Sequence, residues 1–164
     1  MKRALRVSAD TSVFGGCFDE EFMAESVRFF DEVRQGRFVL VVSDVTLDEL
    51  ELAPEVVRGV LAGLPSAQVE LVATSVESEG LRTAYLDAGV VGPASSNDAS
   101  HIAVATVSNV DLVVSWNFRH IVHFVKIGGY EGVNSLRGYR SPRIYSLREV
   151  VTLWTRKRDS TASR

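Results

Sequence analysis

Short apolar runs alternate with longer amphipathic segments along almost the whole of this 164-residue chain. Each run is rich in β-branched residues and is continuously apolar, which is typical of parallel strands that are covered by helices on both faces. Strands that alternate with helices predict βαβ units around a mainly parallel sheet. The predicted strands are residues 4–9, 38–43, 69–74, 111–116 and 142–146.

The segments between these strands carry the apolar spacing and the end signals of helices. Residues 20–36 end at Gly36, a typical residue just past a helix C-terminus. Residues 45–64 predict two short helices that are separated at Pro54. Further helices are predicted at residues 75–88, 98–108 and 147–157, with caps from Ser75, from Ser95, Ser96 and Asn97, and from Ser146.

The chain shows no linker, internal repeat or low-complexity tract, and its length suits one domain with a full hydrophobic core. We predict a single α/β domain over residues 1–155. Residues 128–142 are rich in glycine and polar residues and predict a loop, and residues 156–164 predict a solvated basic tail.

The composition indicates the cellular compartment that we expect for the protein. The first residues lack the apolar stretch of a secretory signal, and no apolar run approaches the roughly 20 residues needed to cross a bilayer. Cys17 is the only cysteine, which excludes an intrachain disulfide and a multi-cysteine zinc site. We therefore expect a reducing, cytoplasmic location with no membrane association.

The net charge of −3 conceals an asymmetry along the chain. Residues 1–118 hold 8 basic and 18 acidic residues, whereas residues 119–164 hold 10 basic and 3 acidic residues. Acidic residues gathered around a metal ion, beside a basic flank that meets phosphates, would produce this division.

Four polar residues are predicted at one end of the sheet. Asp10 directly follows the first strand, Glu49 lies soon after the second, Asp98 begins a helix, and Asn117 follows the fourth strand. Ligands of parallel α/β sheets bind at the carboxyl ends of the strands. Their oxygen atoms are the ligands that a hard cation such as Mg²⁺ or Mn²⁺ prefers, although each residue alone could be a turn residue, a solvated charge or a cap.

The chain here resembles the PIN-domain ribonucleases, a family that includes the toxins of VapBC-type toxin–antitoxin pairs. The resemblance rests on DTSVFGG, VVSDVTLDELEL, SSNDASHIAVATVSNVDLVVSWNFRHIV and PRIYSLREV, which occur in the family's order over nearly the whole chain. It implies a three-layer α/β/α sandwich, a divalent metal held by Asp10, Glu49 and Asp98, and cleavage of RNA. It also implies a small inhibitory antitoxin and a homodimer.

Asn117 departs from the family, because many members carry a fourth acid at this position. An amide oxygen can ligate Mg²⁺ but brings no charge, so we expect one bound metal at rest and a second only with the substrate phosphate.

The metal would activate a water for attack on phosphorus and screen the charge that develops on the phosphate oxygens. Thr11, Ser12, Asn97 and Ser115 are candidates to support the site, or they serve turns and caps.

Basic and aromatic residues of the last third are candidates to contact RNA, through phosphate binding and base stacking respectively. They could equally pack the predicted loop. The candidates are Arg119, Arg137, Arg140 and Arg143 for the phosphates, and Tyr130 and Tyr139 for the bases.

Three other functions stay open at this point. A PIN-like domain that binds RNA or protein without strong catalysis is favoured by Asn117. A metal-free nuclease could use a histidine pair such as His120 and His123, and its activity would survive a chelator. A phosphatase is disfavoured because the DTS motif has no second aspartate two residues later. Asp111, at the start of a strand, is predicted to be structural.

Overall fold

A five-stranded, fully parallel sheet forms the centre of the molecule in the computed structural model, which describes the backbone of residues 3–162 and the side chains of residues 3–153 and 160. The sheet order is β3-β2-β1-β4-β5. The five predicted strands are confirmed to within two residues at each end. They are β1 (Leu5–Ala9), β2 (Phe38–Ser43), β3 (Val69–Val72), β4 (Leu112–Ser115) and β5 (Arg143–Ser146).

The strand order reverses at β1, which pairs with β2 on one side and with β4 on the other. Val7 is in register with Leu40 of β2 and with Leu112 of β4. The carboxyl ends of β1 and β4 therefore open at a topological switch point, where open α/β sheets bind their ligands.

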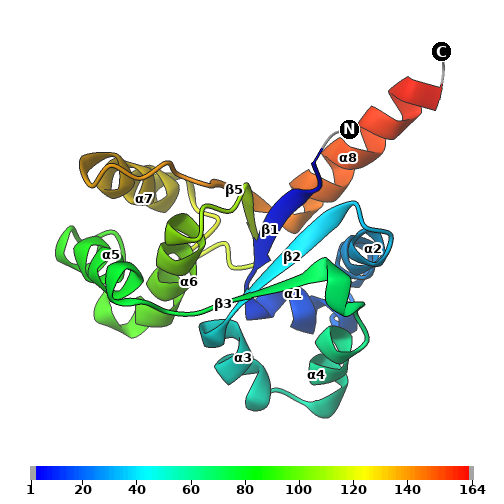
Figure 1. Cartoon of the computed structure of the whole chain (residues 1–164), viewed down its shortest axis with the longest axis horizontal. Helices are drawn as coiled ribbons and strands as arrows, with labels where there is room; N and C mark the ends of the chain where they lie inside the picture. Colours follow the sequence, from blue (N-terminus) through cyan, green and yellow to red (C-terminus); the bar gives the residue numbers. More distant parts are fainter. Residues whose placement is uncertain (1–2, 163–164) are drawn as a thin grey trace.

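Helices cover both faces of the sheet, as Figure 1 shows. One core cluster joins the sheet to α1, α2, α4 and α8, and the other joins it to α5, α6 and α7. This arrangement is the predicted three-layer α/β/α sandwich. The helices are α1 (Thr11–Gly15), α2 (Met23–Arg34), α3 (Asp44–Glu51), α4 (Glu55–Ala62), α5 (Val76–Asp87), α6 (Ser96–Val107), α7 (Phe124–Leu136) and α8 (Leu147–Ala162), with 3-10 turns η1 (Gly16–Phe18), η2 (Ser66–Gln68) and η3 (Pro93–Ser95).

Several helix ends follow from local sequence chemistry. Ser75 and Ser78 form a reciprocal cap at the start of α5, with Ser78 N donating to Ser75 Oγ at 3.1 Å and Ser75 N donating to Ser78 Oγ at 2.8 Å. Ser146 Oγ likewise accepts from Glu149 N. Gly36 ends α2 with a φ of +76°, a conformation that favours glycine. The caps predicted at Ser75, Ser146 and Gly36 are confirmed.

The prediction of a loop over residues 128–142 is wrong, because α7 continues to Leu136. Its glycines suggest a loop, but Gly129 lies so close to Val90 that an added Cβ would be 2.9 Å from a Val90 methyl group. Tyr130 is fully buried with its ring centroid 4.9 Å from that of Tyr85, and its hydroxyl donates to His120 O. Tertiary packing therefore outweighs the low helix propensity of the glycines.

The carboxyl-terminal helix α8 extends away from the sheet (Figure 1). It runs to Ala162, so residues 156–162 of the predicted tail are helical, while the side chains of residues 154–159 lie outside the described part. No helix among the described residues is both long enough and apolar enough to cross a membrane.

Candidate functional site

The structure brings the four predicted ligand residues to the same end of the sheet. Asp10 follows β1 directly and precedes α1, and Asn117 lies two residues after β4. Glu49 is on α3, and Asp98 is in the first turn of α6. Asn117 Nδ2 donates to Asp98 Oδ1 at 3.1 Å, and the charge of Glu49 raises the pKa of both aspartates as one of the smaller contributions. The acids are therefore close enough to influence one another.

Asp10 is only 7% exposed and is held by hydroxyl groups. Ser12 Oγ donates to Asp10 Oδ1 at 2.6 Å and accepts from Trp116 N at 2.9 Å, which ties the end of β1 to the end of β4. Ser115 Oγ lies 3.4 Å from Ser12 Oγ. Burial raises the pKa of Asp10 above its usual value, and the opposing effects of His101, Ser12 and Ser115 do not fully offset that rise.

His101 is a site residue that the sequence prediction missed. It is 6% exposed, and its Nε2 lies 2.5 Å from Glu49 Oε1 while its Nδ1 lies 3.4 Å from Thr46 Oγ1. Burial alone would lower the pKa of His101, but Glu49 and the charges of Asp10 and Asp98 raise it overall. The hydrogen bond to His101 in turn lowers the pKa of Glu49. His101 is thus a buried partner for the acids, and its spacing of three residues from Asp98 on one helix is the signal that could have found it.

Asn117 holds the turn after β4. Its Oδ1 accepts from Arg119 N at 3.1 Å and from His120 N at 2.9 Å, and its amide nitrogen faces Asp98. The amide oxygen that would ligate a metal is therefore engaged by the backbone in this arrangement. Burial raises the pKa of Asp98, against the smaller effects of His120, His101 and the Asn117 hydrogen bond.

Polar groups beside the acids are compatible with a bound cation. Thr11 Oγ1 is buried and makes no hydrogen bond to the described residues, although it lies near enough to Glu49 to lower the pKa of that carboxyl slightly. A buried hydroxyl without a partner marks a place where a water or an ion is expected. The carboxylate oxygens of the three acids are the donors that Mg²⁺ and Mn²⁺ prefer.

The acids do not form a ready-made ligand sphere. Over the described residues, no group of three or more histidine, cysteine, aspartate or glutamate side chains is close enough together to hold a metal ion. Glu49 is directed towards His101, so its carboxylate would have to turn or share its oxygens for the three acids to bind one ion. The carboxylate oxygens and their position at the end of the sheet fit a divalent metal. The present orientation of Glu49, however, is set by its hydrogen bond to His101.

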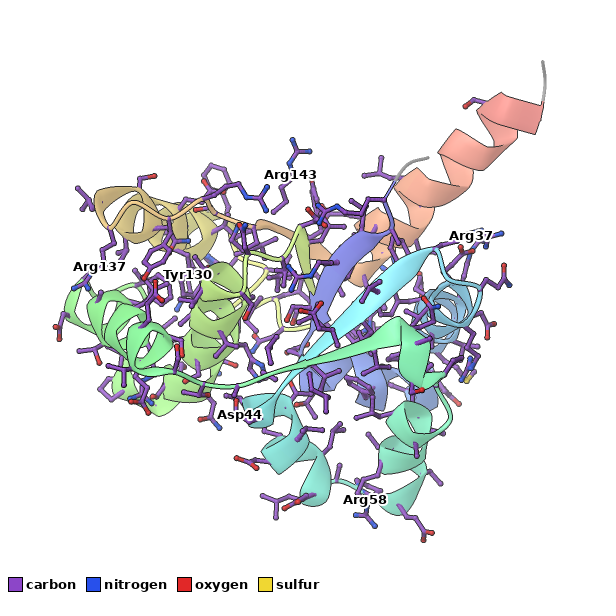
Figure 2. All side chains as sticks on the ribbon, viewed as in Figure 1. Arg37, Asp44, Arg58, Tyr130, Arg137 and Arg143 are labelled. Atoms are coloured by element: carbon purple, nitrogen blue, oxygen red, sulfur yellow. The ribbon has the colours of Figure 1, made fainter. Side chains whose placement is uncertain are left out.

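The predicted RNA-contacting arginines are divided between the two ends of the sheet. Arg119 lies two residues after Asn117, at the acidic end. Arg143 begins β5, and Arg140 Nη2 lies 4.0 Å from Asp111 Oδ1 and donates to Asn109 O at 3.3 Å, so both lie at the amino ends of the strands. Figure 2 shows Arg143 on the opposite side of the molecule from Asp44, which follows the carboxyl end of β2.

The expectation that Arg140 and Arg143 flank the acidic end is therefore wrong, although Arg140 does lie in the short connection between α7 and β5. It failed because residues 128–136 belong to α7, and the chain then returns to the amino end of the sheet before β5 begins. Arg137 follows α7 directly.

The remaining candidate residues make contacts within the fold. Tyr130 is fully buried, which contradicts its proposed stacking on bases, and the hydroxyl of Tyr139 donates to Glu77 Oε1 at 2.5 Å. Asp111 lies at the amino end of β4 as predicted, where it accepts from Arg3 Nη2 at 2.9 Å and from Arg6 N at 2.8 Å. His120 Nδ1 lies 3.3 Å from Lys126 Nζ.

A cleft of about 250 Å³ adjoins the acidic residues between α3, α5 and α6. Glu49 forms part of its wall, and Asn97, a predicted supporting residue, forms another part. Thr74 also lines the cleft, and both Thr74 N and Thr74 Oγ1 donate to Asp44 Oδ1. These contacts fix the start of α3, and hence Glu49, against the segment after β3.

The fold and the position of the acids define a class: a three-layer α/β/α domain with its candidate site at the switch point of a parallel sheet. A solved structure with this fold is the crystal structure of VapBC2 from Rickettsia felis bound to a DNA fragment from their promoter. The TM-score is 0.54 at 11% sequence identity, and the match covers 87% of this chain and 98% of that chain. No protein-family model and no curated protein matches the sequence. The structural likeness supports the PIN-like fold that the sequence motifs imply.

Proposed function

We propose that this protein is a Mg²⁺- or Mn²⁺-dependent endoribonuclease that hydrolyses phosphodiester bonds of RNA. The observation that carries the proposal is the placement of Asp10, Glu49 and Asp98 together at the carboxyl ends of the strands, beside the β1/β4 switch point. The fold likeness to a VapBC complex and the ordered sequence motifs support the same family.

In this proposal each residue of the site has a distinct task. Asp10, Glu49 and Asp98 would hold the ion, which when bound supplies an activated water and neutralises charge on the phosphate oxygens. Ser12 orients Asp10 through its hydroxyl group and the Asn117 amide orients Asp98, whereas Glu49 would share its oxygens between His101 and the ion. Oriented ligands reduce the reorganisation that metal binding requires.

The biological role that we propose is that of a cytoplasmic toxin in a type II toxin–antitoxin pair, inhibited by a small antitoxin protein, and active as a homodimer. It is supported by the family resemblance and by the likeness to VapBC2. Growth arrest on expression, relieved when the antitoxin is co-expressed, is the result that this role predicts.

Cleavage of RNA in the presence and absence of metal tests the enzymatic proposal. Purified protein is expected to cleave single-stranded RNA with Mn²⁺ or Mg²⁺ and to lose all cleavage when EDTA is in excess. Cleavage that persists in EDTA would contradict the metal mechanism and favour acid–base catalysis by histidines.

A catalytically weak, PIN-like module that binds RNA or protein is the second candidate. It is favoured by the engaged oxygen of Asn117 and by the lack, over the described residues, of a ready-made group of three metal ligands. A protein of this kind would bind RNA without cleaving it at any Mn²⁺ concentration.

Replacing Asn117 by aspartate separates the structural and metal-binding roles of this position. The carboxylate still accepts from the backbone of residues 119 and 120, but it loses the donation to Asp98 and adds a charge beside it. We expect the metal-free variant to be less stable by about 1–2 kcal/mol, a fall in melting temperature of about 3–6 °C. The added charge should also enlarge the rise in melting temperature on addition of Mn²⁺.

Asn109→Asp is the matched control, because Asn109 is exposed at the opposite end of the sheet. It should leave the Mn²⁺-induced rise unchanged. An Asn117→Asp protein whose Mn²⁺ response equals that of the wild type would show that position 117 does not face a bound metal.

A further inference from the structure

The cleft beside Glu49 contains a single cationic side chain, Arg82 of α5. The other residues that line the cleft are neutral or acidic, and they include the polar side chains of Thr74, Asn97 and Ser100. Because Glu49 belongs both to the acidic site and to the wall of the cleft, the cleft is a direct extension of the candidate site.

Arg82 lacks the partners that other partly buried arginines of this protein have. Its Nε is buried without a hydrogen bond, and its side chain makes no ion pair with any described residue. By contrast, Arg6 Nε and Nη2 donate to Glu70 at 2.9 and 2.7 Å, and Arg37 Nη1 donates to Glu32 at 2.5 Å.

A buried donor without a partner is unfavourable, so such groups in native proteins mark a missing ligand or water. A guanidinium group presents donors in a planar fork that fits a phosphate or carboxylate with two hydrogen bonds. The neighbouring Asp48 and Glu49 disfavour a small, highly charged anion, whereas a phosphodiester carries a single charge.

We propose that Arg82 binds a phosphodiester of single-stranded RNA that neighbours the phosphate at the acidic residues. This inference rests on the proposed function, since it names where the same substrate continues. The RNA would pass the polar side chains of Thr74, Asn97 and Ser100. Arg82 would fix which phosphate of the RNA lies at Asp10 and Glu49.

Binding of a fluorescein-labelled, single-stranded RNA of eight nucleotides tests the proposal when anisotropy is measured in EDTA over a range of NaCl concentrations. Arg82→Gln should raise Kd about 10-fold, the loss of one charge-assisted contact. It should also reduce the slope of log K against log salt by about 0.7, the value for one phosphate contact on a single strand.

Arg34→Gln is the matched control. Arg34 is an exposed arginine of α2 that pairs with Asp31. α2 packs on the opposite face of the sheet from α5 and α6, two of the helices that line the cleft (Figure 1). Its Kd should stay within about twofold of the wild type and its salt slope should be unchanged, since surface pairs of this kind contribute little. Arg82→Lys keeps the charge and should restore the slope but only part of the affinity.

The outcomes distinguish the inference from the function on which it rests. Unchanged RNA binding by Arg82→Gln, or an equal loss in Arg34→Gln, would overturn the Arg82 site even if the protein cleaves RNA. An Arg82-specific loss of binding supports the site even if the wild type cleaves nothing. Melting temperatures of all three variants identify any loss of binding that is caused by unfolding. If Arg82→Gln reduces the salt slope and Arg82→Lys does not restore it, the proposal would also be overturned.

Discussion

Asp10→Asn is expected to reduce RNA cleavage by about 10²- to 10³-fold or more, because it removes a charged ligand from the proposed metal site. Asparagine keeps the shape and one oxygen of Asp10, so Ser12 Oγ can still donate to it. Cleavage rates with saturating Mn²⁺, for the variant and the wild type, measure the effect.

The same substitution should not destabilise the fold. Burial raises the pKa of Asp10, so the folded protein binds a proton at this carboxyl more tightly than the unfolded chain does. Protonated Asp10 therefore contributes to the free energy of unfolding when the pH is below its pKa in the unfolded chain. This contribution is lost as the pH rises through its pKa in the folded protein. At a pH above the folded pKa the ionised Asp10 opposes folding, and there Asp10→Asn should melt at the same temperature as the wild type or at a higher one.

Asp31→Asn is the control for a generic loss of charge, because Asp31 pairs with Arg34 on the surface of α2. It should cleave RNA within about twofold of the wild type. Wild-type cleavage by Asp10→Asn, with the same metal dependence, would show that Asp10 does not belong to the catalytic site.

The largest structural effect is expected for Gly16→Ala. A Cβ at this position would lie 2.5 Å from Ser26 Oγ and 2.9 Å from Trp116 Nε1, two atoms that are joined by a buried hydrogen bond of 2.9 Å. The substitution therefore both overpacks the core and breaks this bond. We expect a loss of about 3 kcal/mol in the free energy of unfolding, and a fall of about 6–12 °C in melting temperature.

The adjacent glycine supplies the matched control. Gly15 is also helical, and an added Cβ would meet no atom within 4 Å. Gly15→Ala should leave stability unchanged or raise it by up to about 1 kcal/mol, because alanine favours a helix. Equal melting temperatures for the two variants would contradict the close approach of Gly16 to Trp116.

The fold could be predicted because its strands are continuous apolar runs and its helices carry local end signals. Ser75 and Gly36 act through neighbouring backbone groups, so their effects can be read from sequence alone. α7 could not be predicted this way, because its glycines are held in a helix by contacts such as that between Gly129 and Val90. The short α1 after Asp10 was also missed.

The sequence predicts those site residues that directly follow a strand. Asp10 and Asn117 follow β1 and β4, and parallel strands must bring their ends together. The helical spacing from Asp98 could have placed His101 beside the acids, but its contact with Glu49 and the position of Arg82 depend on which side chains meet across α3, α5 and α6. No local pattern contains that information. Arg140 and Arg143 were misplaced for the same reason, since the direction of the chain after α7 is set by packing.

Direct binding of Mn²⁺ is the most direct test of the central claim that Asp10, Glu49 and Asp98 hold a divalent metal. Electron paramagnetic resonance of free Mn²⁺, titrated into wild-type protein and into Asp10→Asn, counts the ions bound per chain. We predict one ion per wild-type chain without RNA, and loss of that ion in Asp10→Asn without a fall in melting temperature. Equal Mn²⁺ binding by the two proteins, or none by the wild type, would contradict the metal site.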